Sequence, residues 1–310
     1  MNNLSNTILD YYWAHFDELP FEKQFHFASR LYLWNQDPVA KQKLAELRPI
    51  FTANDQPDSA LHDVITLARN SSSHGSKNAA ELRRPYFEKY PQLKAYVSGL
   101  FRLTFLQNIY SYDVRTVFFD EFPETDVRSF ARELAADREA IAILSTHAIN
   151  FLYLCSRVLC DESSAIAPED FITIGRKQYD FSNPLHLQLY IYLYTHCIIG
   201  ESQFYYRAIG QPAPYLTMLT ELEATIAQHY DSINLDNKFE FLVCCRQLGY
   251  ASSLQDQIYQ EAEISVSELG SFLIDRHNGN PQTSNVTLDL SEHRNVLFIM
   301  SHSAYRPLGR

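Results

Sequence analysis

The chain has 310 residues, and its 26 Lys and Arg against 37 Asp and Glu give a formal net charge of −11. A content of 46% hydrophobic and 20% charged residues is typical of a globular protein and excludes a disordered chain. Because phosphate contacts need clustered cations, the acidic balance argues against a nucleic-acid partner and against docking on an anionic membrane.

The sequence lacks the motifs of several large enzyme classes. None of its nine glycines belongs to a dinucleotide-binding or P-loop motif, and neither H-E-x-x-H nor G-x-S-x-G occurs. So few glycines also disfavour a β-sandwich or barrel, whose tight hairpins often need glycine. No motif in the chain is specific enough to assign it to a family.

The five cysteines indicate the compartment. Their number is odd, they lie in apolar stretches, and no C-x-x-C is present, a pattern typical of reduced, buried thiols. The beginning of the sequence shows no signal peptide, and the longest apolar stretch, 185–199, is too short and too polar to span a bilayer. We therefore expect a soluble cytoplasmic protein.

Residues 1–76 are predicted to form an N-terminal helical subdomain. Pro20 and Pro38 each begin a helix, because proline is well tolerated in the first helical turn. The polar stretch 71–78, SSSHGSKN, has no hydrophobic period and is the predicted linker.

Residues 77–270 are predicted to form the main domain, an array of helical hairpins. The stretch 140–159 is apolar on nearly all sides, so we expect one central helix there. Asn183 and Pro184 begin the longest helix, and Gly249 ends a later one. Because the connections are short, neighbouring helices should be antiparallel, which predicts an all-α fold, an irregular α/α solenoid or a partial toroid.

Residues 271–310 are predicted to form a C-terminal loop/β extension packed on the main domain. The stretches 271–275 and 286–290 have β-type composition and flank a segment rich in turn residues, which predicts a small β-hairpin. Ser291 would then cap a final segment that fits either a helix or a short buried strand.

The first candidate site lies inside the predicted central helix. His147 and Asn150 are three residues apart and share a helical face in a stretch that is otherwise apolar. Buried polar groups are normally hydrogen-bonded, so the two side chains either line a pocket or tie neighbouring helices together.

The second candidate site lies in the predicted longest helix. His196 and Glu201 are five residues apart, about 140° around a regular helix, so they share a face only if Gly200 permits a local bulge. Glu201 needs a partner, which is either Arg207 or an arginine elsewhere. If His147 and His196 face one cavity, the site could bind a divalent metal or transfer protons. The alternative is a hydrogen-bond network inside a helical core.

Further ligand-binding candidates are aromatic or lie near the C-terminus. Tyrosine suits a groove for a peptide or a sugar, because its ring is apolar and its hydroxyl forms hydrogen bonds. Polar loops on a helical scaffold are frequent binding sites as well. His62 and Asp63 have the order used by all-α metal phosphohydrolases, although composition alone gives about 11 × 18/310, or roughly 0.6, such dipeptides by chance. The predicted ligand-binding residues are Tyr192, Tyr205 and Arg207 in the aromatic stretch and Asp275, His277 and His293 near the C-terminus.

The sequence supports two functions. The favoured interpretation is a helical scaffold that binds a protein, a peptide or a small ligand in an aromatic-lined groove. The alternative is a hydrolase-type enzyme, with or without a divalent metal, whose catalytic residues are His147, Asn150, His196 and Glu201 in the helical core. The cofactor, the metal dependence and the oligomeric state stay open.

Overall fold

The computed structural model describes residues 2–51, 66, 77–160, 167–267, 270–274 and 287–309. In these residues the chain forms fifteen α-helices and no strand, which confirms the predicted all-α class. The chain divides into two compact units. Unit 1 comprises Met1–Ala45 and Tyr205–Arg310, and unit 2 comprises Glu46–Phe204. Unit 1 thus joins both ends of the chain, which the predicted consecutive segments 1–76, 77–270 and 271–310 do not anticipate.

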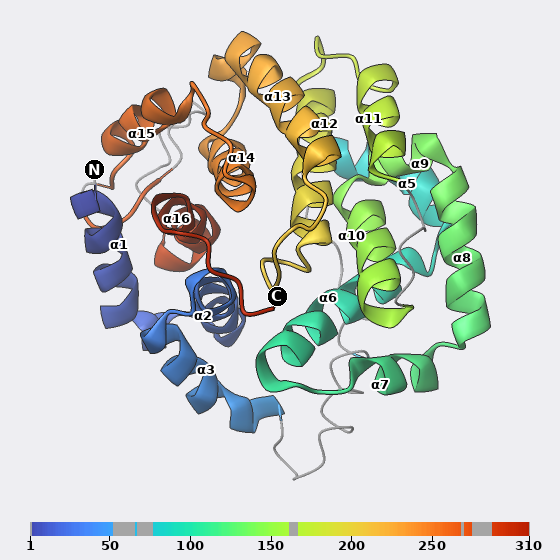
Figure 1. Cartoon of the computed structure of the whole chain (residues 1–310), viewed down its shortest axis with the longest axis horizontal. Helices are drawn as coiled ribbons and strands as arrows, with labels where there is room; N and C mark the ends of the chain where they lie inside the picture. Colours follow the sequence, from blue (N-terminus) through green and yellow to red (C-terminus); the bar gives the residue numbers. More distant parts are fainter. Residues whose placement is uncertain are drawn as a thin grey trace. The chain divides into compact units, whose positions relative to one another are not determined.

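The last helix is the centre of unit 1. This helix, α16 (Leu288–His302), packs against α1 (Asn2–Ala14), α2 (Phe21–Asn35) and α14 (Leu235–Leu248), as Figure 1 shows. Most of its residues from the second turn onward are buried, so its polar side chains must find partners inside the unit. The unit also contains α13 (Ala213–Gln228), α15 (Gln255–Ile264) and the beginning of α3 (Pro38–Phe51).

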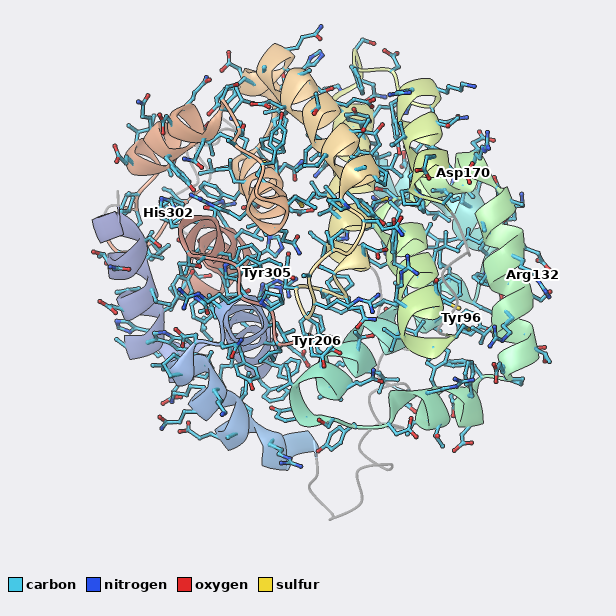
Figure 2. All side chains as sticks on the ribbon, viewed as in Figure 1. Tyr96, Arg132, Asp170, Tyr206, His302 and Tyr305 are labelled. Carbon is cyan, nitrogen blue, oxygen red and sulfur yellow. The ribbon has the colours of Figure 1, made fainter. Side chains whose placement is uncertain are left out.

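Unit 2 is arranged around α10 (Thr146–Leu154), which packs against α6 (Leu93–Tyr110) and α12 (Pro184–Glu201) (Figure 1). Tyr96 on α6 is buried with its ring 5.7 Å from that of Phe151 on α10, whereas Arg132 lies on the exposed face of its helix (Figure 2). The remaining elements are α5 (Lys77–Lys89), α7 (Val114–Glu121), α8 (Glu124–Ala136), α9 (Arg138–Leu144), the π-helical turn Cys155–Leu159 and α11 (Pro168–Lys177).

Local sequence signals set several helix ends as predicted. The side chain of Asn183 accepts a hydrogen bond of 3.0 Å from a backbone N–H in the first turn of α12, and Pro184 is the first residue of that helix. Gly249, with φ of 63°, follows the last residue of α14, where a left-handed conformation favours glycine. Pro38 begins α3, and Pro20 directly precedes α2.

The predicted single helix over 140–159 is wrong, because the chain bends sharply at Ser145. α9 and the stretch Thr146–Leu159 are bent by 111° relative to each other. Ser145 is fully buried, with φ of 48° and ψ of −112°, and its hydroxyl donates to the backbone carbonyl of Leu189 on α12 at 3.2 Å. This tertiary contact accompanies a backbone conformation that residues other than glycine rarely adopt.

None of the described helices is by itself long and apolar enough to cross a membrane. The bent pair formed by α9 and Thr146–Leu159 reaches that length and apolar character only when its two parts are counted together.

The C-terminal segment differs from the predicted hairpin. Residues 288–290 form the first turn of α16, and Ser291 is buried inside that helix instead of capping it. Leu273 forms an isolated antiparallel bridge with Val266. The rest of the predicted hairpin, 275–286, and most of the predicted linker, 71–76, lie outside the described residues.

Candidate functional site

Asn150 and His196 are brought together by α10 and α12. The Nδ1 of His196 donates to the Oδ1 of Asn150 at 2.8 Å, and the ring of Tyr192 lies 5.9 Å from the imidazole in an edge-on arrangement. Gln188 donates to the hydroxyl of Tyr192 at 3.2 Å. Residues 188, 192 and 196 are four apart and share one face of α12. Three of the predicted site residues, Asn150 on α10 and Tyr192 and His196 on α12, therefore lie together.

His147 faces a different neighbour, although it lies on the same helix as Asn150. Its ring meets that of Phe87 on α5 at 5.2 Å in a T-shaped arrangement. Its Nδ1 is buried and has no side-chain hydrogen-bond partner among the described residues, while the backbone of Leu144 acts to raise its pKa. The two candidate histidines thus have separate contacts, one with α5 and the other with Asn150.

Arg83 is a site residue that the sequence analysis missed. It lies on α5, and its Nε donates to the backbone carbonyl of Ile143 in the last turn of α9 at 3.2 Å. Burial lowers its pKa, and the phenols of Tyr192 and Tyr179 act in the opposite direction. Within the described part of the chain, no carboxylate pairs with this guanidinium. The only sequence signal is an arginine pair, 83–84, which does not indicate which member turns inward.

The electrostatic environment of His147 is cationic. Burial first, and then the charges of Arg83 and Lys94, lower its pKa to about 4. Lys94 on α6 lies with its Nζ 4.3 Å from the centroid of the Phe87 ring. At neutral pH His147 is therefore an uncharged imidazole beside the basic side chains of Arg83 and Lys94. We call Arg83, Phe87, Lys94, His147 and Tyr192 the Arg83 cluster.

Glu201 has a partner of its own. Its Oε2 accepts hydrogen bonds from Nη2 and Nε of Arg157 at 2.8 and 3.1 Å, so an arginine other than Arg207 supplies the expected ion pair. Gly200 lies within the continuous helix α12, so the local bulge that would bring His196 and Glu201 to one face does not form there. A Cβ at Gly200 would lie 2.8 Å from Cβ of Tyr153, so this glycine permits the close approach of α10 and α12.

The candidates Tyr205 and Arg207 belong to unit 1 and serve in its packing. Tyr205 is 2% exposed, and its ring lies 5.6 Å from that of Trp34 on α2. The hydroxyl of Tyr305 donates to the backbone carbonyl of Arg207 at 2.7 Å.

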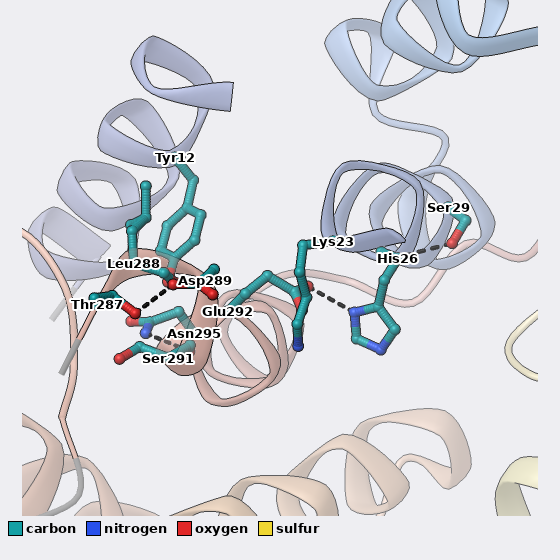
Figure 3. Close-up of polar contacts among 10 residues, drawn as sticks. All are labelled: Tyr12, Lys23, His26, Ser29, Thr287, Leu288, Asp289, Ser291, Glu292 and Asn295. Atoms are coloured by element: carbon teal, nitrogen blue, oxygen red, sulfur yellow. Dashed lines mark hydrogen bonds and ion pairs between the residues drawn. The ribbon is translucent and has the colours of Figure 1, made fainter. Parts of the chain in front are cut away.

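Unit 1 holds a second polar cluster around Glu292, which Figure 3 shows. The carboxylate lies on α16 and accepts from Nδ1 of His26 at 2.6 Å and from Nζ of Lys23 at 3.3 Å, both on α2. Burial opposes ionisation of Glu292, but His26, Lys23 and Arg30 hold its pKa below the ordinary value. The candidate His293 borders this cluster, with its ring centroid 5.5 Å from that of His26.

The imidazole of His26 is hydrogen-bonded through only one of its two ring nitrogens within the described part of the chain. Burial and the charge of Arg30 lower its pKa, although Glu292 acts in the opposite direction. The bond to Glu292 occupies Nδ1, whereas Nε2 forms no hydrogen bond with a described residue. The side chain is 22% exposed. A neutral imidazole oriented by a carboxylate in this way can accept a proton at Nε2.

Several predicted residues cannot be placed. Asp275 and His277 lie outside the described residues, as do His62 and Asp63. In the part of the chain that is described, no group of three or more His, Cys, Asp and Glu side chains is arranged to hold a metal ion. Its exposed large hydrophobic residues, Val39, Ile264 and Leu290, lie on three different helices.

Comparison with protein-family models, with curated proteins and with solved structures finds no match for this chain. The functional argument therefore depends on the chemistry of the two clusters.

Proposed function

We propose that the chain is a cytoplasmic scaffold of helical hairpins and that unit 2 binds a small anionic ligand, a carboxylate or a phosphate, at the Arg83 cluster. The observation that carries the proposal is Arg83, a partly buried cation without a described carboxylate partner. Removing a cation from water is costly unless an anion compensates it. A bound ligand would supply that anion.

The geometry of arginine favours this class of ligand. The planar guanidinium can form two parallel hydrogen bonds with a carboxylate or a phosphate. In Arg83 the Nε already donates to the carbonyl of Ile143, which fixes the orientation of the group, while its terminal nitrogens have no described hydrogen-bond acceptor. Lys94 adds a second cation within reach of His147.

The surrounding side chains fit a ligand that also has an apolar or a polar neutral part. The ring of Phe87 offers an apolar contact, and the uncharged imidazole of His147 can either donate or accept a hydrogen bond. The predicted ligand classes are a protein, a peptide and a small ligand. An aromatic and cationic lining of this kind favours the small ligand.

The test is a titration of the purified chain by calorimetry, first with inorganic phosphate and then with acetate, with glycerol as the neutral probe. We expect at least one of the two anions, phosphate or acetate, to bind. Arg83→Gln should weaken this binding about 10- to 100-fold, since a hydrogen bond to a charged group contributes about 1.5–3 kcal/mol. Arg84→Gln is the matched control, because Arg84 is the exposed neighbour on the same helix. Failure of both anions to bind, or equal loss in the two variants, would contradict the proposal.

A second candidate function is proton transfer by His26 in unit 1. The observation that favours it is the 2.6 Å bond to a wholly buried carboxylate, which leaves Nε2 of a neutral imidazole without a described partner. We expect His26 to react with diethyl pyrocarbonate at pH 7 faster than His147, whose Nδ1 is buried. Slower modification of His26 than of His147 would remove this candidate.

A further inference from the structure

We propose that Cys155 and Cys160 form a reversible thiol–disulfide pair, a modification site distinct from both clusters above. Their Sγ atoms are 3.9 Å apart, and both residues belong to one short segment of unit 2. A disulfide requires an S–S distance of about 2.05 Å, so bond formation needs a further approach of about 2 Å. Rotation of the two side chains and a small tightening of the backbone can supply it.

The backbone explains why these two thiols meet. Residues five apart in a regular α-helix lie about 140° apart around the axis and point to different faces. Here the chain forms a π-helical turn over Cys155–Leu159, and the N–H of Cys160 donates to the carbonyl of Cys155 at 2.9 Å. This wider turn aligns the two residues. Single π turns are rare and occur frequently at functional sites.

The other three cysteines, Cys197, Cys244 and Cys245, are buried, which makes them poor candidates for the same chemistry. The thiolate is the reactive form of cysteine, and burial raises the pKa of Cys197 and of Cys245. Cys160, by contrast, is partly exposed, whereas Cys155 is 4% exposed. An oxidant therefore reaches Cys160 first, and Cys155 is placed to resolve the product.

The reaction balances with a peroxide as oxidant. The Cys160 thiolate attacks one oxygen of hydrogen peroxide, the O–O bond breaks, and a sulfenic acid forms as hydroxide leaves and takes up a proton. The Cys155 thiolate then attacks the Cys160 sulfur, the S–O bond breaks, and a second water leaves. Two thiols and one peroxide thus give one disulfide and two waters, and an added dithiol reverses the change.

The turn that the disulfide would close is connected to α12 by the ion pair between Arg157 and Glu201. Arg157 lies within it, pairs with Glu201, and accepts a hydrogen bond at its backbone carbonyl from Nε2 of Gln203 at 2.9 Å. A disulfide across the turn would restrain the segment that presents Arg157. Oxidation is therefore expected to change the thermal unfolding midpoint by a few degrees.

The experiment is peptide mapping of the full chain after oxidation with hydrogen peroxide and alkylation of the remaining thiols. Trypsin cuts after Arg157, so Cys155 lies in peptide 139–157 and Cys160 in peptide 158–176. We expect these two peptides to be linked, the link to disappear with dithiothreitol, and Cys160→Ser to abolish it while Cys197 stays alkylated. Sulfinic acid on Cys160 with alkylated Cys155, or a disulfide that instead joins two chains, would overturn the proposal.

Discussion

Glu292 accepts a hydrogen bond of 2.6 Å from Nδ1 of His26 at a position where its side chain has no contact with solvent. Replacing the carboxylate with an amide, Glu292→Gln, leaves the nearby Lys23 without its counter-charge. We expect the free energy of unfolding to fall by about 1.5–3 kcal/mol, the usual contribution of a hydrogen bond to a charged group, because Lys23 is 36% exposed and water compensates part of its charge. Urea unfolding at pH 7 measures the effect, and the exposed Glu263→Gln should stay within about 0.5 kcal/mol of the wild type. Equal stability of the two variants would show that the bond to His26 contributes nothing.

The lowered pKa of His147 predicts acid destabilisation. The folded chain holds it at about 4, against 6.5 for an ordinary histidine. Between these values the unfolded state binds more protons, so the free energy of unfolding falls as pH decreases from 6.5 towards 4. The full shift corresponds to about 3 kcal/mol. In buffers without phosphate or carboxylates, His147→Gln should flatten this pH dependence by about 2 kcal/mol between pH 7 and pH 5. A variant with the pH dependence of the wild type would contradict the assignment.

Gly200 should tolerate no side chain. In Gly200→Ala the new Cβ would lie 2.8 Å from Cβ and Cγ of Tyr153, so α10 and α12 must move apart. We expect a loss of about 1–3 kcal/mol in thermal or urea unfolding, the usual effect of overpacking. Gly210→Ala is the matched control, because a Cβ there meets no atom within 4 Å. Similar losses in both variants would indicate a backbone effect of glycine instead of close helix packing.

The bend at Ser145 can be tested by two substitutions at one position. Ser145→Ala removes the hydroxyl bond to Leu189 and keeps a Cβ at φ of 48°. Ser145→Gly removes the same bond but relieves the strained conformation. We therefore expect the glycine variant to be more stable than the alanine variant by about 1 kcal/mol. An alanine variant that is the more stable of the two would mean that the residue is unstrained.

Local signals explain why part of the fold was predictable. The beginning of α12 depends on Asn183 and Pro184 themselves, and the end of α14 depends on the left-handed conformation of Gly249. Such signals act within one helical turn, so the sequence displays them directly. The all-α class follows from many of them together.

The remaining features depend on distant contacts. Ser145 bends the chain next to Leu189, 44 residues away, and the apolar pattern continues through the bend without interruption. Residues 288–290 have β-type composition, yet they form the beginning of a helix whose core face packs against three others. Burial of that face outweighs local preference.

The candidate site was predictable in the same partial sense. Asn150 and His196 were singled out as polar residues in apolar helices, and the structure joins them across 46 positions. Arg83 was not, because an arginine in a polar helix looks solvent-exposed until α9 is seen to accept its hydrogen bond. Pairing between helices is a tertiary property that a single sequence does not display.

The pKa of His147 with and without a bound anion is the most direct test of the binding site. An anion held by Arg83 and Lys94 would favour the charged imidazolium, so saturating phosphate should raise the pKa of His147 above about 4. NMR titration of ¹³C-labelled histidines measures this shift, with His15 in unit 1 as the internal reference. Phosphate that binds without moving the pKa of His147, or that moves both histidines equally, would place the anion elsewhere and contradict the account.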